Sequence, residues 1–339
     1  MHASRRPEET MMEEIELLCC PACSGDLKMD GARVACRSCR ATYETSEGII
    51  NFVGDDNVVD EQEVIEIDEL IGELRQGLGT ARSLLDATSL PNRRNTEARY
   101  RSEVKSLRNL KRNYAHAFSG GRVLDYSCGA GRGARIAAEM GAKEVWVADI
   151  TYSPVKYCLE VMRKVFPKTR FHGVVAASDS IPFKDDFFDA ILIYGSLHHY
   201  PNMDEFLQRC SRISRHLFIV AEPATLGAWQ RLIDRSGFST EYGDADTHRV
   251  DEAQLVRTLA ACGMKVKSER LNQYYPKALA FAGNFRPFYS LWFAGLAVLD
   301  RVLPREWRHS LNIYASRAEV PAKLPKRRSK SEQSTARAA

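Results

Sequence analysis

Residues 123–133 read VLDYSCGAGRG, a short apolar run followed by a cluster of glycines. The apolar run is typical of a buried strand, and the glycines predict a tight turn into a helix that begins near Gly131. Because glycine has no Cβ, backbone N–H groups and the start of that helix can approach a ligand closely. The stretch predicts a site for a small anionic or polar ligand; the alternative is a tight turn with a purely structural role.

From Arg122 onward, short apolar runs alternate with segments of helical periodicity, which is typical of βαβ units and a parallel sheet. We therefore expect an α/β fold. Strands are expected at 123–125, 144–148, 171–175, 190–194, 217–221, 265–269 and 311–315, and helices at 131–140, 154–165, 203–213 and 251–262.

Asp149 stands at the end of the second expected strand. An acidic residue at about this distance after a glycine turn accepts the ribose hydroxyls of bound nucleotides in Rossmann-type folds. The glycine turn and Asp149 together indicate a cofactor that contains adenosine.

Two further stretches complete a resemblance to a known family. Residues 178–190 read SDSIPFKDDFFDA and residues 197–199 read LHH. With the glycine turn, they resemble the class I SAM-dependent methyltransferases, in particular the small-molecule branch that includes quinone methylases. The resemblance implies a Rossmann-like seven-stranded sheet with helices on both faces and S-adenosylmethionine (SAM) as cofactor.

The resemblance also implies roles for individual residues. The backbone at Gly129 and Gly131 would cradle the methionine part of SAM, Asp125 would face its amino group, Asp149 would take the ribose hydroxyls, and Ile150 would pack on adenine.

The sequence departs from the family pattern at two places. Ser127 stands where the first glycine of the motif is usual, and the family's adenine-binding aspartate falls on Ala177. Ser178 would then offer its backbone N–H to adenine, while Asp179 either substitutes on a reshaped loop or caps a turn. The cofactor-binding set is Asp125, Ser127, Gly129, Gly131, Asp149, Ile150, Ser178, Asp179 and Tyr194.

Methyl transfer is an in-line displacement, so holding the acceptor against the methyl group supplies much of the catalysis and a base is optional. Tyr194 lies at the end of the fourth strand and His198 just past it, where the methyl group is expected. We predict that both residues line the pocket and assist catalysis. Alternatively, the histidine pair caps the next helix. Glu222 is a pocket candidate of lower rank.

Five of the nine cysteines lie within residues 19–39. Cys20, Cys23, Cys36 and Cys39 form two Cys-x2-Cys pairs separated by twelve residues that contain a hairpin signal, Asp30-Gly31. Four thiolates at this spacing predict a closed, structural zinc site.

The segment that carries these cysteines resembles short zinc ribbons fused to bacterial methyltransferases. It would recognise substrate, shield an apolar face or stabilise the fold, and a structural role is the expectation. Whether Cys19 or Cys20 is the first ligand is left open by the sequence.

Length and composition indicate a soluble globular protein with two folding units. The 339 residues carry a net charge of +4, and no run of 18 apolar residues is present, so a cytoplasmic location is expected. The predicted organisation is a flexible tail (1–16), a zinc ribbon (17–54), a helical linker (55–97), a methyltransferase domain (98–317) and a disordered basic tail (318–339).

Residues 274–303 are rich in aromatic and aliphatic side chains. They would roof a pocket for an apolar acceptor such as a lipid, quinone or natural product, contact a membrane surface, or simply cover the sheet as core. Two other functions are weighed: an rRNA or tRNA methyltransferase that uses the ribbon to recognise RNA, and a scaffold that binds SAM without turnover. The sequence predicts no oligomeric state.

Overall fold

The computed structural model describes residues 14–53, 107–225, 249–271 and 286–317. The expected helical linker (55–97), the basic tail (318–339) and residues 274–285 of the aromatic segment lie outside the described residues.

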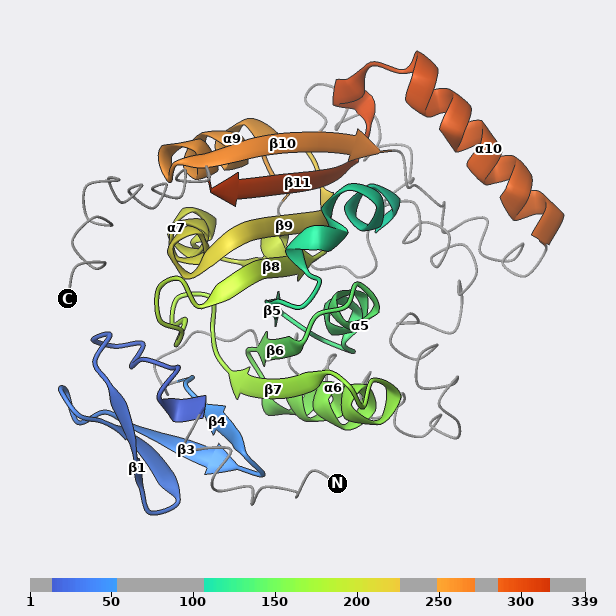
Figure 1. The fold of residues 1–339 in the computed structure, drawn as a ribbon. Coiled ribbons are helices and arrows are strands. Elements are labelled where there is room, and N and C mark those ends of the chain that lie inside the picture. Colours follow the sequence, from blue (N-terminus) through green and yellow to red (C-terminus); the bar gives the residue numbers. More distant parts are fainter. Residues whose placement is uncertain (1–13, 54–106, 226–248, 272–285, 318–339) are drawn as a thin grey trace, which may run out of the picture.

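Seven strands form the central sheet, as the sequence predicts (Figure 1). Their order is β7-β6-β5-β8-β9-β11-β10; the first five are parallel, and β11 runs antiparallel to both β9 and β10. The central strands are buried on both faces, which explains their continuous Val, Leu and Ile content. The strands are β5 (Arg122–Tyr126), β6 (Glu144–Asp149), β7 (Arg170–Val175), β8 (Phe188–Tyr194), β9 (Ser214–Pro223), β10 (Met264–Leu271) and β11 (Ser310–Arg317).

Helices cover both faces of this sheet, and each face has its own apolar core. Helices α5 (Arg132–Glu139) and α6 (Tyr152–Val165) pack on one face, together with a helical segment at residues 107–114. Helices α7 (Met203–Ile213) and α9 (Glu252–Ala261) pack on the other face. The two-sided arrangement positions every loop after a parallel strand along one edge of the sheet.

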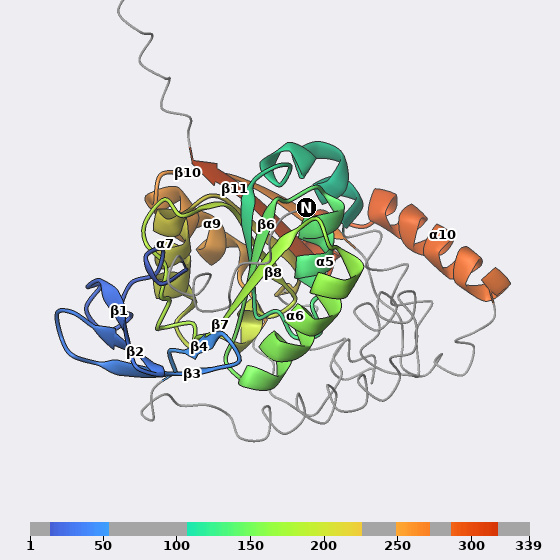
Figure 2. The ribbon, with the colours of Figure 1, turned by 60° about the horizontal axis from the view of Figure 1, so that its bottom comes forward.

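The N-terminal module, residues 14–53, is not separate from this sheet. Its strands are β1 (Leu27–Asp30), β2 (Arg33–Cys36), β3 (Thr42–Ser46) and β4 (Ile49–Asn51). Strand β4 pairs in parallel with β7, so the sheet continues through β4 and β3 to β2 and β1, as both views show (Figure 2).

Two details of the module differ from the sequence expectation. Pairing in the first hairpin continues to Asp30 and Arg33, so the turn residues are Gly31 and Ala32, and only Gly31 has a positive φ (63°). In addition, the folded part begins before residue 17, because Ile15 is buried against the sheet and Glu14 contacts His172 of β7.

Helix α10 (Arg286–Val302) runs outward from the side of the molecule near β10 and β11 in both views (Figures 1 and 2). A 3-10 turn at Arg305–Trp307 joins it to β11. In the part of the chain that the structure describes, no helix has both the length and the apolar character needed to span a membrane.

Candidate functional site

The turn after β5 has the backbone of a glycine loop at three positions. Ser127, Gly129 and Gly131 have positive φ values of 58°, 45° and 87°. A non-glycine residue in this left-handed region is strained by about 1 kcal/mol or more. Ser127 therefore keeps the conformation of the usual glycine, and its hydroxyl shares a hydrogen bond of 2.5 Å with the hydroxyl of Tyr200.

Asp125 lies under this turn and is buried. Its Oδ2 accepts a hydrogen bond of 2.7 Å from the backbone N–H of Ala134 in the first turn of α5. A Cβ on Gly133 would stand 2.0 Å from Asp125 Oδ1, so only glycine fits there. Burial raises the pKa of Asp125 to about 7. The structure thus shows this carboxyl fixing the start of α5.

Asp149 ends β6 and faces the same turn. Its Oδ2 accepts a hydrogen bond of 2.9 Å from the N–H of Gly129, which ties together the two features that the sequence relates only by spacing. Burial raises the pKa of Asp149 to about 6.

Two observations at this turn fit an adenosine cofactor. The hydroxyl of Thr151, two residues beyond Asp149, is buried without a hydrogen-bond partner, as expected of a group that a ligand completes. A Cβ on Gly129 would meet no atom within 4 Å, so the backbone borders open space where a ligand can approach.

The loop after β7 carries the residues predicted to contact adenine. Ala177 is buried, Ser178 is half-buried and Asp179 is exposed. The N–H of Ser180 donates to the carbonyl of Ala177 (3.0 Å), and the Tyr126 hydroxyl donates to the same carbonyl (2.7 Å). Ile150 is half-buried beside Asp149. The structure therefore places Asp179 on a surface turn and Ala177 inside it.

A buried carboxylate organises the loop after β8. Glu222 of β9 is fully buried, and its Oε1 accepts hydrogen bonds from the N–H groups of Ser196 (2.9 Å) and Leu197 (3.0 Å). Its Oε2 lies 2.8 Å from Nδ1 of His198. The geometry fixes the imidazole of His198 on the 3-10 turn Leu197–His199.

The sequence ranks Glu222 below His198 and Tyr194 and does not single out Tyr200. Their partners are backbone groups and side chains far along the chain, so local patterns give no sign of the contacts. The position of Glu222 near the carboxyl end of a parallel strand is the one available signal.

Tyr194 is half-buried at the end of β8, on the face covered by α5. The guanidinium of Arg132, the first residue of α5, lies 4.9 Å from the centre of its ring. The structure thus brings the glycine turn, Asp149, Tyr194 and His198 to the carboxyl-terminal edge of the parallel strands.

The four predicted metal ligands also come together. The sulfur atoms of Cys20, Cys23, Cys36 and Cys39 all lie within 4.8 Å of one another. The Cys20–Cys39 and Cys23–Cys36 distances are 3.6 and 3.4 Å, close to the separation of about 3.8 Å in a tetrahedral zinc–thiolate site.

Backbone N–H groups stabilise the thiolate of Cys36, and Cys19 lies outside the cluster. The N–H groups of Cys39 and Ser38 donate to Cys36 Sγ and lower the pKa of that thiol to about 6. Cys19, by contrast, lies with its Sγ 3.7 Å from the guanidinium of Arg209. Cys20, not Cys19, is therefore the first member of a cluster that is consistent with a zinc ribbon.

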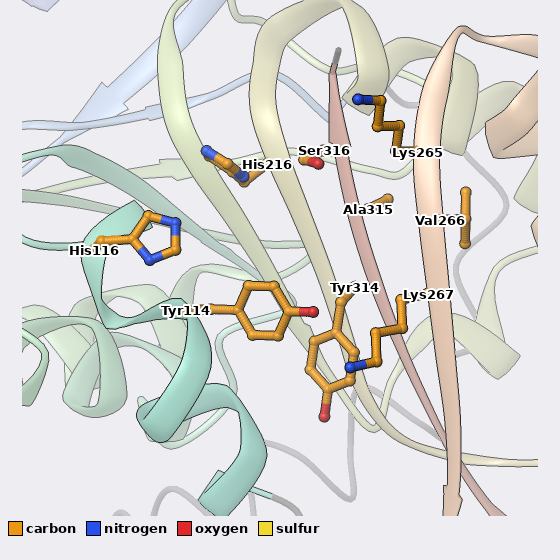
Figure 3. A pocket seen from close by; sticks show the side chains of 9 residues that line it. All are labelled: Tyr114, His116, His216, Lys265, Val266, Lys267, Tyr314, Ala315 and Ser316. Atoms are coloured by element: carbon orange, nitrogen blue, oxygen red, sulfur yellow. The ribbon is translucent and has the colours of Figure 1, made fainter. Parts of the chain in front are cut away.

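A separate hollow of about 230 Å³ lies beside β9, β10 and β11 (Figure 3). His216 and Ser316 place it near the start of β9, at the opposite edge of the sheet from the glycine turn. Its lining is aromatic and basic, and Tyr114 stacks on Tyr314. The lining residues are Tyr114, His116, His216, Lys265, Val266, Lys267, Tyr314, Ala315 and Ser316.

Comparison with known proteins identifies the family. A methyltransferase domain model matches residues 124–217. The chain is 27% identical over 206 residues to a Mycobacterium ulcerans protein named "Probable phthiotriol/phenolphthiotriol dimycocerosates methyltransferase 2", with 59% of this chain and 72% of the relative covered. It is 29% identical over 120 residues to a fatty-acid O-methyltransferase of Mycolicibacterium smegmatis, with 34% and 42% covered.

A solved structure shares the fold. The crystal structure of magnesium protoporphyrin IX methyltransferase from Synechocystis PCC 6803 with bound SAH has a TM-score of 0.50 at 14% identity, and the match covers 76% of this chain and 100% of that chain. The strand order, the glycine turn and the acidic end of β6 define a Rossmann-like methyltransferase fold. The chain is a class I SAM-dependent methyltransferase.

Proposed function

We propose that this methyltransferase acts on an apolar, lipid-like acceptor. The observation that carries the proposal is the apolar face of α10: Leu291 is 74% exposed, Val298 55% and Val302 67%. Residues seven and four positions apart lie on one side of a helix, and an exposed apolar face of this kind suits contact with lipid. The names of the two relatives, a dimycocerosate and a fatty-acid methyltransferase, support the same acceptor class.

In this proposal SAM lies across the glycine turn at the carboxyl edge of the sheet, and it supplies a methyl group on a sulfonium. Asp149 accepts the ribose hydroxyls, Gly129 and Gly131 line the methionine part, and Ile150 and Ser178 border adenine. The buried, unpaired hydroxyl of Thr151 supports this placement. Asp125 supports the turn from below through its hydrogen bond to Ala134, and Tyr194 forms a wall of the pocket.

His198 is proposed as the base for an acceptor hydroxyl. Glu222 lies against Nδ1 and so directs Nε2 toward the proton of the acceptor. When bound, SAM would supply its methyl group to the acceptor oxygen and would leave as S-adenosylhomocysteine, while Nε2 of His198 would take the proton of the acceptor hydroxyl. Glu222 is a positioning residue that stabilises the imidazolium.

The test supplies the full chain and SAM with hydroxylated long-chain lipids, free fatty acids and total RNA, and identifies methylated products by mass spectrometry. We expect a methylated hydroxyl lipid. His198→Ala is expected to lower kcat by about 10²–10⁴ while the Kd for SAM stays unchanged. His116→Ala is the control, because this exposed imidazole lies beside the hollow at the opposite edge of the sheet.

Two outcomes would contradict the proposal. Methylated RNA without methylated lipid would favour the nucleic-acid alternative. If His198→Ala turns over a hydroxyl acceptor at the wild-type rate, His198 is not the base. The proposals for SAM binding and for the acceptor class would not be affected by that result.

A further inference from the structure

The N-terminal module holds the loop after β7 at its beginning. Strand β4 pairs with the last residues of β7, with Ile50 opposite Val174 and Asn51 opposite Val175. The N–H of Phe52 then donates to the carbonyl of Val175 (2.8 Å). Since the loop starts at Ala176, its first residue is fixed from the side of the module.

The same module holds the loop at its end. Leu18 forms an antiparallel bridge with Phe183, and the N–H of Cys19 donates to the carbonyl of Pro182 (2.9 Å). Leu18 and Phe183 are both buried in one apolar cluster that contains residues of the module and of the sheet. The loop is therefore pinned at both ends by elements that lie more than 120 residues earlier in the chain.

Helix α7 reinforces the second contact. Arg209 donates to the carbonyl of Phe183, pairs with Asp185 (2.6 Å) and approaches Cys19 Sγ (3.7 Å). By contrast, the pair Lys184–Asp26 (2.9 Å) is exposed and contributes little. Arg209 of α7 thus contacts both the end of the loop and the segment that precedes the first metal ligand, Cys20.

The cysteine cluster fixes where that segment lies. Cys20 follows Cys19 directly, so the first ligand is one residue from the contact with Pro182. A bound ion would tie residues 20–23 to residues 36–39, and thereby to the hairpin that leads into β3 and β4. Because folding free energy and metal binding are coupled in such sites, we expect the position of Leu18 and Cys19 to depend on the ion.

We propose that the four-cysteine module is a metal-dependent clamp on loop 176–183, and that through this loop it sets the affinity for SAM. The inference rests on the proposed placement of adenine beside Ser178. The clamp makes the module a part of the cofactor site, and it needs no contact between the module and an acceptor.

The test compares the zinc-loaded full chain with the same chain after chelation, with zinc content measured by mass spectrometry. Metal loss is expected to raise hydrogen exchange in residues 176–183 while strand β9 (214–223) stays protected. If the ordered loop falls to about one tenth of the population, the Kd for SAM rises about tenfold. Unchanged exchange and an unchanged Kd after metal loss would overturn the clamp.

Two variants keep the test decisive if chelation unfolds the chain. Leu18→Ala shortens the module side chain that is buried beside Phe183 but leaves the four cysteines, so we expect full zinc content, faster exchange at 176–183 and weaker SAM binding. Lys184→Ala, the matched control, is expected to change neither the exchange nor the SAM binding. A Leu18→Ala variant with wild-type exchange in the loop would overturn the clamp, whereas wild-type protein that fails to bind SAM would instead refute the proposed site.

Discussion

Gly129 and Gly133 are four residues apart and are required for different reasons. Gly129 has a positive φ and borders open space, so a ligand can approach its backbone. Gly133 faces Asp125, where a Cβ would stand 2.0 Å from a carboxyl oxygen, so its role is to let α5 start against a buried acid. The sequence predicts a glycine turn, but it does not separate these two roles.

The pair gives a sharp mutational contrast. Gly133→Ala forces Asp125 or the start of α5 to move, and we expect a loss of about 1–3 kcal/mol in the free energy of unfolding. Gly129→Ala should fold with a smaller loss and bind SAM poorly. Thermal melts and titration calorimetry on both variants check this, and equal stability losses would contradict it.

The raised pKa of Asp149 leads us to predict that cofactor binding depends on pH. Burial raises its pKa to about 6, and only the ionised carboxylate accepts two ribose hydroxyls. We expect a constant Kd for SAM above about pH 7 and a rise approaching about tenfold per pH unit below pH 6. Calorimetry between pH 5 and 8 measures it, and an equal Kd at pH 5 and pH 8 would contradict it.

The same carboxyl has the opposite effect on stability. Its folded pKa lies above the unfolded value of about 3.9, so the folded state binds the proton more tightly, and this contribution to stability grows as the pH falls from about 6 to 4. Asp149→Asn, which removes a buried charge, should therefore melt at or above wild type at pH 8 without ligand and bind SAM weakly at every pH.

At the level of elements, the sequence predicts all seven strands of the central sheet and misses β3 and β4. The buried parallel strands coincide with apolar runs, whereas β10 is largely polar and follows the Gly263 turn after α9. Strand β3 alternates exposed and half-buried residues, and β4 has only three residues. The pairing of β4 with β7 joins segments far apart in the chain, which no local pattern encodes.

Helix α10 gives a prediction of its own. Replacing Leu291, Val298 and Val302 by serine is expected to abolish flotation with anionic vesicles and to leave the thermal melt nearly unchanged, because these side chains are exposed. Val298→Ile with Val302→Ile, the matched control, keeps the apolar face and should float like wild type. If the serine variant floats with the vesicles as wild type does, this face of α10 does not contact lipid.

At the scale of the whole molecule, two segments with different sequence signatures share one core. Residues of the module, such as Leu27, Val34 and Phe52, lie in the same apolar cluster as Trp146 and Phe183. The spacing of the cysteines predicts the cluster of ligands because it depends on local geometry. It does not predict the docking, because Leu18 and Cys19 carry no metal signature and their partners follow the third strand of the central sheet.

The pairing of β4 with β7 also decides where the protein can be divided. Without residues 14–53, the end of β7 at Val174 and Val175 would lose its partner strand, and Phe183 would lose its bridge to Leu18. Such an edge recruits strands from other molecules, so a fragment that lacks residues 14–53 but keeps all seven strands of the central sheet is expected to self-associate. A soluble fragment for crystallography or screening should therefore keep the chain from residue 14 onward.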